Sequence, residues 1–263
     1  MKYYLSALLL VVGQLTYADP YAGMSPEEKG LAIAEAADEK TNGFIDSSAN
    51  MKMILTNKHG QSSERELRVR SMEVENDGDK SMTIFDTPAD VKGTALLTYS
   101  HKVKDDDQWL YLPAVKRVKR MSSSNKSGPF MGSEFSFEDM GSQEVEKYTW
   151  KYLRDETIEG KDAFVVERVP VNKRSGYTSQ ILWTYKDELY PIKIDFYDRK
   201  KSLLKTLTFN DYKQYKDKFW RAHDMMMVNH QTGKKTQLLW SDIAYENGYK
   251  DSNFTKNSLK RLR

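Results

Sequence analysis

Cysteine is absent from this chain of 263 residues, and histidine occurs only four times. The absence of cysteine excludes disulfides, thiolate chemistry, cysteine-bound metals and the attachment of lipid to a thiol. Stability therefore has to come from an ordinary hydrophobic core. A large excess of charge of one sign is also missing, since 41 basic residues stand against 38 acidic ones. This balance does not indicate bulk nucleic-acid binding, and no nucleic-acid partner is expected.

Motifs for catalysis or metal binding are missing as well. The four histidines are scattered and show neither His-x-His nor His-Glu-x-x-His spacing for zinc. His223 and His230 lie seven residues apart in a predicted strand, so they should point to opposite faces. No serine stands within Gly-x-Ser-x-Gly. We therefore expect no catalytic residues, no metal and no cofactor, and we do not expect an enzyme.

The N-terminus has the pattern of an export signal. Lys2 precedes the apolar run 5–12, and small residues follow at positions 16–18. The alternative is an N-terminal membrane anchor, but the apolar run is about half of the roughly 20 residues that span a bilayer. We predict that residues 1–18 are a cleaved signal peptide. Without a cysteine to lipidate, the mature chain is expected to be exported and soluble rather than tethered to a membrane.

One helix and then a long series of strands are predicted. Ser25 and Pro26 form a helix start, and a weak apolar stripe continues to 42, where Asn42 and Gly43 give a stop signal. From Ser48 onward the hydrophobic period changes to two, which is typical of strands. Short turns join many of the candidate strands. These strands are 48–56, 62–70, 80–85, 93–100, 107–112, 116–121, 144–154, 163–170, 177–185, 191–197, 203–215, 219–229 and 234–243.

This pattern predicts a mainly β chain that folds as an antiparallel meander. No linker or change in composition divides residues 19–263, so a single domain is expected. A sheet of ten or more strands has to curl or close, because strands twist. The strands at 180–185 and 236–240 carry apolar side chains on both faces. Either both faces meet a lid or an apolar ligand, or these are central strands of an ordinary core.

Residues 108–140 combine an amphipathic strand, a cationic run and a long loop. Lys116, Arg117, Lys119 and Arg120 are candidates for contact with an anionic headgroup or an acidic partner. The alternative is a solvated strand edge that charge protects from aggregation. The loop 122–140 carries Gly128, Gly132 and four large apolar side chains. It is interpreted either as a lid or partner surface, or as a permanent plug of the core.

Several blocks of the sequence together resemble one known family. They include the Trp-Leu-Tyr-Leu-Pro-Ala block at 109–114 with 116–118, the loop blocks 123–128 and 130–135, and Glu138-Asp139. Further blocks lie at 86–95, 197–200, 204–207, 228–233 and 258–263. In these residues the chain resembles the outer-membrane lipoprotein-sorting (LolA-like) family. The resemblance implies an incomplete antiparallel β-barrel of about 11 strands, wrapped over a helical lid, with an apolar interior for acyl chains.

The resemblance also implies a function, which is a periplasmic carrier that moves an acyl-bearing cargo, lipoprotein or lipid, between the inner and outer membranes. It implies a monomer that works with an inner-membrane exporter of RND or ABC type and with an outer-membrane acceptor. The alternative is a binding module without transport activity that docks on an RND-type exporter or an envelope assembly. The predicted cavity and lid residues are Trp109, Tyr111, Phe130, Met131, Phe135, Phe137, Trp183 and Trp240.

Overall fold

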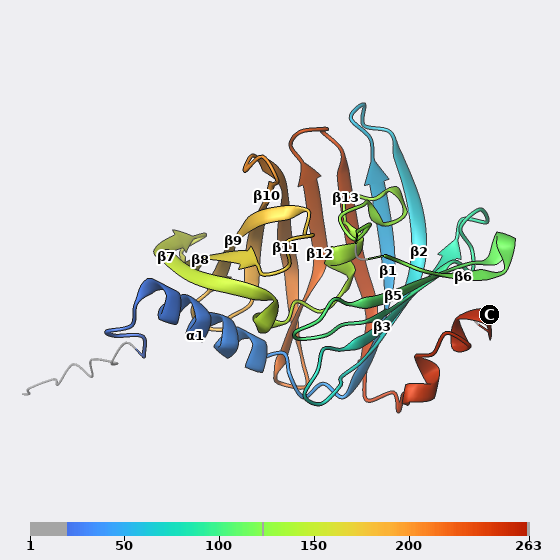
Figure 1. Cartoon of the computed structure of the whole chain (residues 1–263). Coiled ribbons are helices and arrows are strands. Elements are labelled where there is room, and N and C mark those ends of the chain that lie inside the picture. Colours follow the sequence, from blue (N-terminus) through green and yellow to red (C-terminus); the bar gives the residue numbers. More distant parts are fainter. Residues whose placement is uncertain (1–19, 123, 262–263) are drawn as a thin grey trace, which may run out of the picture.

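The computed structural model describes residues 20–122 and 124–261, and its main element is one curled antiparallel sheet (Figure 1). The predicted signal peptide, residues 1–18, lies outside the described residues. The strand order is β6-β5-β4-β3-β2-β1-β13-β12-β11-β10-β9-β8-β7. Two meanders, β1 to β6 and β7 to β13, are therefore joined side by side through the pairing of β1 with β13.

The strands are β1 (Asp46–Thr56), β2 (Ser62–Met72), β3 (Lys80–Thr87), β4 (Ala95–Tyr99), β5 (Asp107–Leu112), β6 (Arg117–Arg120), β7 (Tyr148–Ile158), β8 (Lys161–Pro170), β9 (Tyr177–Tyr185), β10 (Pro191–Asp198), β11 (Leu203–Tyr215), β12 (Phe219–Asn229) and β13 (Lys235–Tyr245). The α-helix α1 spans Pro26–Glu39. Short 3-10 helices occur at η1 (Pro113–Val115), η2 (Phe130–Gly132), η3 (Phe137–Met140), η4 (Val145–Lys147), η5 (Asp251–Asn253) and η6 (Ser258–Arg261).

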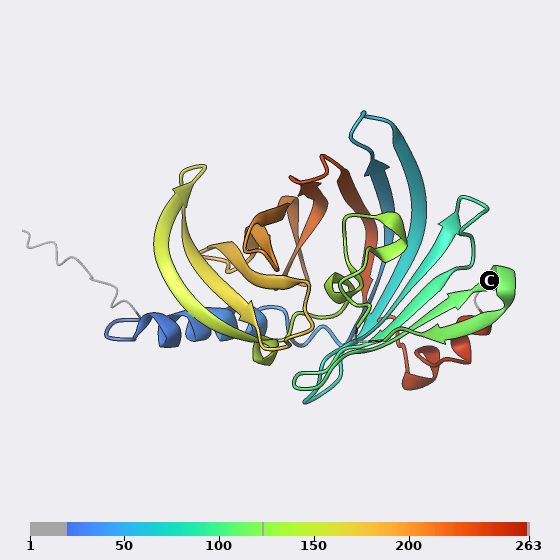
Figure 2. The same ribbon diagram turned by 45° about the horizontal axis from the view of Figure 1, so that its top comes forward.

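The predicted fold class, mainly β with an incomplete antiparallel barrel, is confirmed, and the one correction is that the sheet has 13 strands rather than about 11. The sheet is open, because β6 and β7 are edges that do not pair with each other. Strand β6 has only four residues and therefore offers little backbone for pairing. The connection between β6 and β7 runs through the hollow of the sheet instead of along its edge (Figure 2). One end of the hollow is therefore filled from inside by the protein's own chain.

Helix α1 begins as predicted and ends three residues earlier, at Glu39. Its start is a capping box, in which the Glu28 amide donates to Ser25 Oγ at 3.2 Å and the Ser25 amide donates to Glu28 Oε2 at 2.8 Å. The helix lies against β7 and β8, where Ile33 packs with Phe164 and Val166. A side chain added at Gly30 would come within 2.6 Å of the Tyr152 amide nitrogen. Glycine therefore lets the helix approach the backbone of the edge strand β7.

Residues 124–140 of the predicted loop, which we call the plug segment, lie on the concave face of the sheet. Its Phe130, Phe135 and Phe137 are 0%, 5% and 8% exposed and belong to the main core cluster. That cluster also contains inward-facing residues of both meanders, including Met53 and Leu207. The structure thus supports the plug interpretation of this loop, in which its large side chains are part of the core.

A buried ion pair fixes the plug segment to the sheet. Lys205 of β11 is 3% exposed, and its Nζ donates to Asp139 Oδ2 and to the Glu134 carbonyl oxygen, both at 2.8 Å. The hydroxyl of Tyr177 donates to Asp139 Oδ1 at 2.9 Å. From the other meander, Gln108 Nε2 donates to the carbonyl oxygen of Phe137 at 2.8 Å. Side chains from β5, β9 and β11 therefore hold one short stretch of the plug segment.

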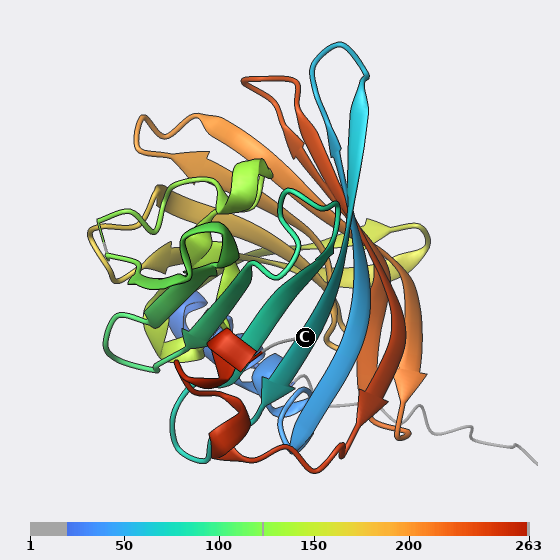
Figure 3. The same cartoon turned by 90° about the vertical axis from the view of Figure 1, so that its right-hand side faces the viewer.

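The convex face of β3, β4 and β5 is covered by the C-terminal segment (Figure 3). Phe254 and Leu259 are 1% and 0% exposed and pack with Ile84, Leu97 and Trp109 in a second core cluster. Alternate residues of these strands face the main cluster inside, so both faces of this part of the sheet are dry. This arrangement explains why successive apolar residues occur in these strands.

We predict that Gly30→Ala destabilises the protein. This is the opposite of the usual effect, since alanine is normally more favourable than glycine inside a helix by roughly 0.8–1 kcal/mol. The added methyl group would have to displace α1 from β7, and the free energy of unfolding in urea should fall. A partly exposed alanine on the same helix gives the control, since Ala36→Gly should cost little more than the ordinary helix-propensity difference. A more stable Gly30→Ala protein would contradict the close packing.

We also predict that Lys205→Met lowers the free energy of unfolding by about 3–5 kcal/mol, because Asp139 would remain buried without its cation. Adding Asp139→Asn should restore part of this loss, since the neutral amide needs no counter-charge. Lys52→Met provides the matched control. Its pair with Glu64 is 44% and 58% exposed, so the expected loss is below about 1 kcal/mol. Additive losses in the double variant would show that the two side chains are not coupled.

Candidate functional site

A large cavity lies between α1 and the concave face of the sheet. Its volume is about 1260 Å³, above the roughly 300–1,000 Å³ that is common for small-molecule sites. Helix α1 contributes Ile33, Ala34 and Ala37. The other apolar lining residues include Phe44, Val69, Trp150, Val166, Leu182, Ile194, Phe209, Met225 and Trp240.

The plug segment and the cavity divide the concave face along the strands. On β11, Lys205 and Leu207 contact the plug segment or its core, whereas Phe209 and Tyr212 line the cavity. On β13, Thr236 accepts a hydrogen bond from the Glu134 amide at 3.0 Å, and the cavity begins at Trp240. The plug segment therefore fills one end of the curled sheet, and the cavity occupies the other end beneath α1.

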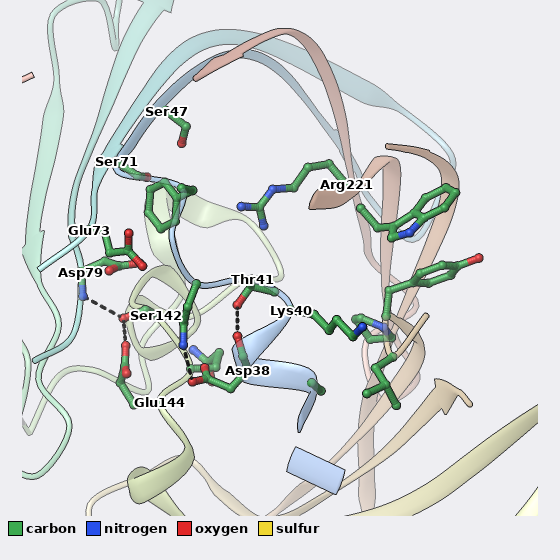
Figure 4. A pocket seen from close by; sticks show the side chains of 18 of the residues that line it. Asp38, Lys40, Thr41, Ser47, Ser71, Glu73, Asp79, Ser142, Glu144 and Arg221 are labelled. Atoms are coloured by element: carbon green, nitrogen blue, oxygen red, sulfur yellow. Dashed lines mark hydrogen bonds between the residues drawn. The ribbon is translucent and has the colours of Figure 1, made fainter. Parts of the chain in front are cut away.

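One wall of the cavity is acidic (Figure 4). It contains Asp38, Glu73, Asp79 and Glu144. Glu73 accepts hydrogen bonds from the amides of Gly43 and Ile45, at 2.6 and 3.1 Å. Burial and the charges of Glu144 and Glu73 raise the pKa of Asp79 to about 7. Burial also raises the pKa of Glu144. This wall therefore holds carboxyl groups that are costly to ionise together.

Arg221 of β12 lies opposite this wall and extends toward the interior of the cavity in Figure 4. Its Nε donates to the Tyr245 hydroxyl at 2.8 Å. Arg168 also lines the cavity and is 5% exposed. Its Nε donates to Gln180 Oε1 at 2.7 Å, and its guanidinium lies 4.3 Å from the centre of the Tyr148 ring. The cavity therefore combines a substantial apolar lining with charged groups that are distributed unequally over its walls.

The two predicted cavity tryptophans lie on opposite faces of the sheet. Trp240 lines the cavity, and its indole N–H donates to the Met225 sulfur at 3.3 Å. Trp183 does not line it, which differs from the prediction. Its indole N–H donates to Glu156 Oε2 at 3.1 Å, and the Lys193 ammonium lies 3.6 Å from the ring centre. Its neighbour Leu182 faces the cavity instead, because successive side chains of a strand alternate.

The other predicted ligand residues also lie outside the cavity lining. Trp109 and Tyr111 of β5 pack in the convex cluster beneath the C-terminal segment. Phe130, Phe135 and Phe137 are core residues of the plug segment, and Met131 packs against the same core while partly buried. The physical reason is the same in both places, because the protein's own chain already covers these side chains.

The four predicted cations do not form one cluster. Lys116 is the left-handed cap residue of η1, and the other three lie on β6. Arg117 and Lys119 pair with Leu112 and Leu110, which face the concave side, whereas Arg120 pairs with Trp109 on the convex side. Arg120 also forms an ion pair with Asp107. These four basic residues therefore place positive charge on both faces of the edge strand β6 and its start.

Sequence reasoning missed Arg221 and the acidic wall. Arg221 is separated from Met225 and Met227 by an even number of residues, so alternation places it on the same inner face of β12. A cation at an inward position could therefore have been recognised from the sequence. The acidic wall had no such signal, because its members come from α1, the segment between β2 and β3, and the segment before η4. Within residues 20–122 and 124–261, no group of three or more histidine, aspartate or glutamate side chains is placed to hold a metal ion. No helix in the same ranges is both long and apolar enough to span a membrane.

We predict that Asp79→Asn stabilises the protein progressively as the pH rises. The folded state retains the Asp79 proton up to about pH 7, whereas the unfolded chain loses it near pH 4. Within this window the folded state binds more protons, so its stability falls with pH by at most about 1.4 kcal/mol per unit. Asparagine removes this loss. Urea unfolding at pH 5, 6 and 8 measures the effect, and Asp187→Asn at an exposed turn is the control. A difference from the unmodified protein that does not grow with pH would rule out Asp79 as the group.

Comparisons with known proteins agree with this architecture. A family model described as that of an uncharacterized protein matches residues 77–261. A domain from Vibrio parahaemolyticus assigned to outer-membrane lipoprotein sorting is 57% identical, with a TM-score of 0.88, over 89% of this chain and 100% of that one. A DUF1329 family protein from Desulfovibrio piger is 31% identical, with a TM-score of 0.85, over 90% and 100% of the two chains.

A LolA-superfamily protein from Nitrosomonas europaea shares the fold at 22% identity, with a TM-score of 0.71, over 87% of this chain and 98% of that one. No curated protein sequence matches the chain significantly. The resemblance seen in the sequence is thus confirmed by a relative of high identity over nearly the full described length. The chain belongs to the LolA-like family of outer-membrane lipoprotein-sorting domains.

Proposed function

We propose that this protein is a soluble periplasmic carrier that holds the acyl chain of a lipid or lipoprotein in the cavity beneath α1 and moves it between the inner and outer membranes. The observation that carries the proposal is the cavity itself, whose lining includes many apolar side chains of the inner strands and α1. Membership in a lipoprotein-sorting family supports the same use. Export by a signal peptide at residues 1–18 is part of the proposal.

The energetics suit a carrier. Each methylene group removed from water contributes roughly 0.8 kcal/mol, so a chain of eight buried methylenes contributes about 6 kcal/mol before the costs of ordering. This attraction does not depend on a precise fit, because hydrophobic burial is not directional. The plug segment limits how far such a chain can enter, since it occupies the other end of the concave face. A cargo is therefore held under α1, the element whose displacement would open the cavity.

Transfer also requires partners, and we propose an inner-membrane exporter and an outer-membrane acceptor. A second candidate function, a docking module without transport, is favoured by one observation. The edge strand β6 is open, and its Arg117, Lys119 and Arg120 are exposed. An acidic partner strand could pair with this edge.

Native mass spectrometry of detergent-free protein separates the two candidate functions, since a carrier should retain about one lipid per chain. A mass without lipid, unchanged after incubation with phospholipid and lipopeptide, would favour docking.

We predict that Trp240→Glu strongly weakens uptake of a fluorescent fatty acid, by about 30-fold or more, while the thermal transition stays cooperative. The substitution places a carboxylate in the apolar lining and removes a large apolar surface, worth roughly 2–3 kcal/mol. Fluorescence titration of the probe measures the affinity.

Two controls accompany this variant. Trp240→Leu keeps the site apolar and should retain most of the uptake, and Trp183→Leu alters a tryptophan outside the lining. Uptake that is equally weakened by Trp183→Leu would place the acyl chain elsewhere. Unchanged uptake by Trp240→Glu would remove the cavity from the proposal.

A further inference from the structure

The basic side chains that line the cavity differ in their hydrogen-bond and ion-pair partners. The Lys102 ammonium pairs with Glu146 at 3.6 Å. The Lys218 ammonium donates to the Asn42 carbonyl oxygen at 2.5 Å. Lys40 is the exposed cap residue that follows α1. Arg168 is enclosed between amide and aromatic side chains. These four cations therefore have structural partners or stand in water.

Arg221 is different. Its only side-chain hydrogen bond to a described residue runs from Nε to the Tyr245 hydroxyl, and it forms no ion pair with a described carboxylate. A guanidinium carries five N–H groups and keeps its charge at any physiological pH. Four of these groups, on Nη1 and Nη2, remain available on the side that faces the cavity. Such a fork matches the geometry of a carboxylate or a phosphate.

The surroundings of Arg221 fit one orientation of an amphiphile. The acidic wall across the cavity, with Glu73, Asp79 and Glu144, disfavours an anionic group on that side. The hydrophobic lining near Arg221 includes Trp220, Met225 and Trp240, which can accept the attached hydrocarbon. A partly dry setting also strengthens an ionic hydrogen bond relative to one in water.

We propose that Arg221 binds the headgroup of the cargo, and that the cargo is an amphiphile whose headgroup is a carboxylate or a phosphate. Tyr245 positions the guanidinium by accepting from its Nε. The inference rests on the proposed carrier function, because it concerns the same cavity. It goes further in assigning a charge to the cargo, which separates fatty acids and acidic phospholipids from neutral glycerides.

The test compares two matched pairs of competitors for a bound fluorescent acyl probe. Palmitate is compared with hexadecanol, and 1-palmitoyl-glycerol-3-phosphate with 1-palmitoylglycerol, each below its aggregation concentration. The unmodified protein should bind each anion about 10–100-fold more tightly than its neutral counterpart, which is the range expected for a charge-assisted hydrogen-bond pair. A preference in only one pair distinguishes a carboxylate cargo from a phosphate cargo.

The variants then assign the preference to one residue. Arg221→Gln should weaken binding of the anions about 10–100-fold and change binding of the neutral compounds less than about threefold. Arg221→Lys should retain part of the preference, because it keeps the charge without the fork. Arg154→Gln, on the exposed edge strand β7 and outside the cavity lining, removes the same charge and should have no effect.

The outcomes separate the headgroup proposal from the carrier proposal. Equal affinity for anionic and neutral compounds, or equal losses for both in Arg221→Gln, would overturn the role of Arg221 and leave the carrier function standing. If no acyl compound displaces or binds, the carrier function itself fails. A thermal transition like that of the unmodified protein must accompany each variant, and Arg221→Lys provides the test if Arg221→Gln does not fold.

Discussion

The ion pair between Lys205 and Asp139 is the interaction on which the rest of the arrangement depends. An open sheet of this size exposes a long inner face, and the plug segment covers one end of it with Phe130, Phe135 and Phe137. Apolar packing alone does not fix the depth or register of a loop, because it is not directional. The buried cation adds a directional constraint, since its ammonium donates to both Asp139 and the Glu134 carbonyl oxygen.

The position of the plug segment determines what remains of the concave face. The same strands that contact the plug segment at one end continue into the cavity at the other, as Leu207 and Phe209 of β11 show. Helix α1 packs tightly on β7 through Gly30 and borders the cavity with Ile33, Ala34 and Ala37. One loop and one helix thus divide a continuous apolar surface into a permanent core and an accessible space.

Sequence periodicity predicted the helix start and most strands, since the capping box and the alternation of side chains are local signals. It did not predict which face of each strand is concave. The structure places Leu182 in the cavity lining and Trp183 on the opposite face, whereas we predicted Trp183 in the cavity. The alternation of side chains separates the two faces of a strand but does not show which face is concave. The convex cover was missed because its anchors, Phe254 and Leu259, are two isolated apolar residues in a polar tail. Likewise, the acidic wall assembles carboxylates from distant segments, which only the topology brings together.

Affinity and selectivity have different sources in such a cavity. Burial of hydrocarbon supplies most of the binding free energy, but it rewards every acyl chain alike and cannot discriminate among headgroups. Discrimination requires groups that one headgroup satisfies and another leaves unpaired. An asymmetric pair of walls, with carboxyl groups on one side and Arg221 on the other, meets this requirement while occupying little of the lining. Because the acidic side contains Asp79, whose pKa is raised to about 7, the electrical asymmetry increases as this group ionises above neutral pH. Charge rather than shape is therefore the property by which this cavity can select among acyl-bearing molecules.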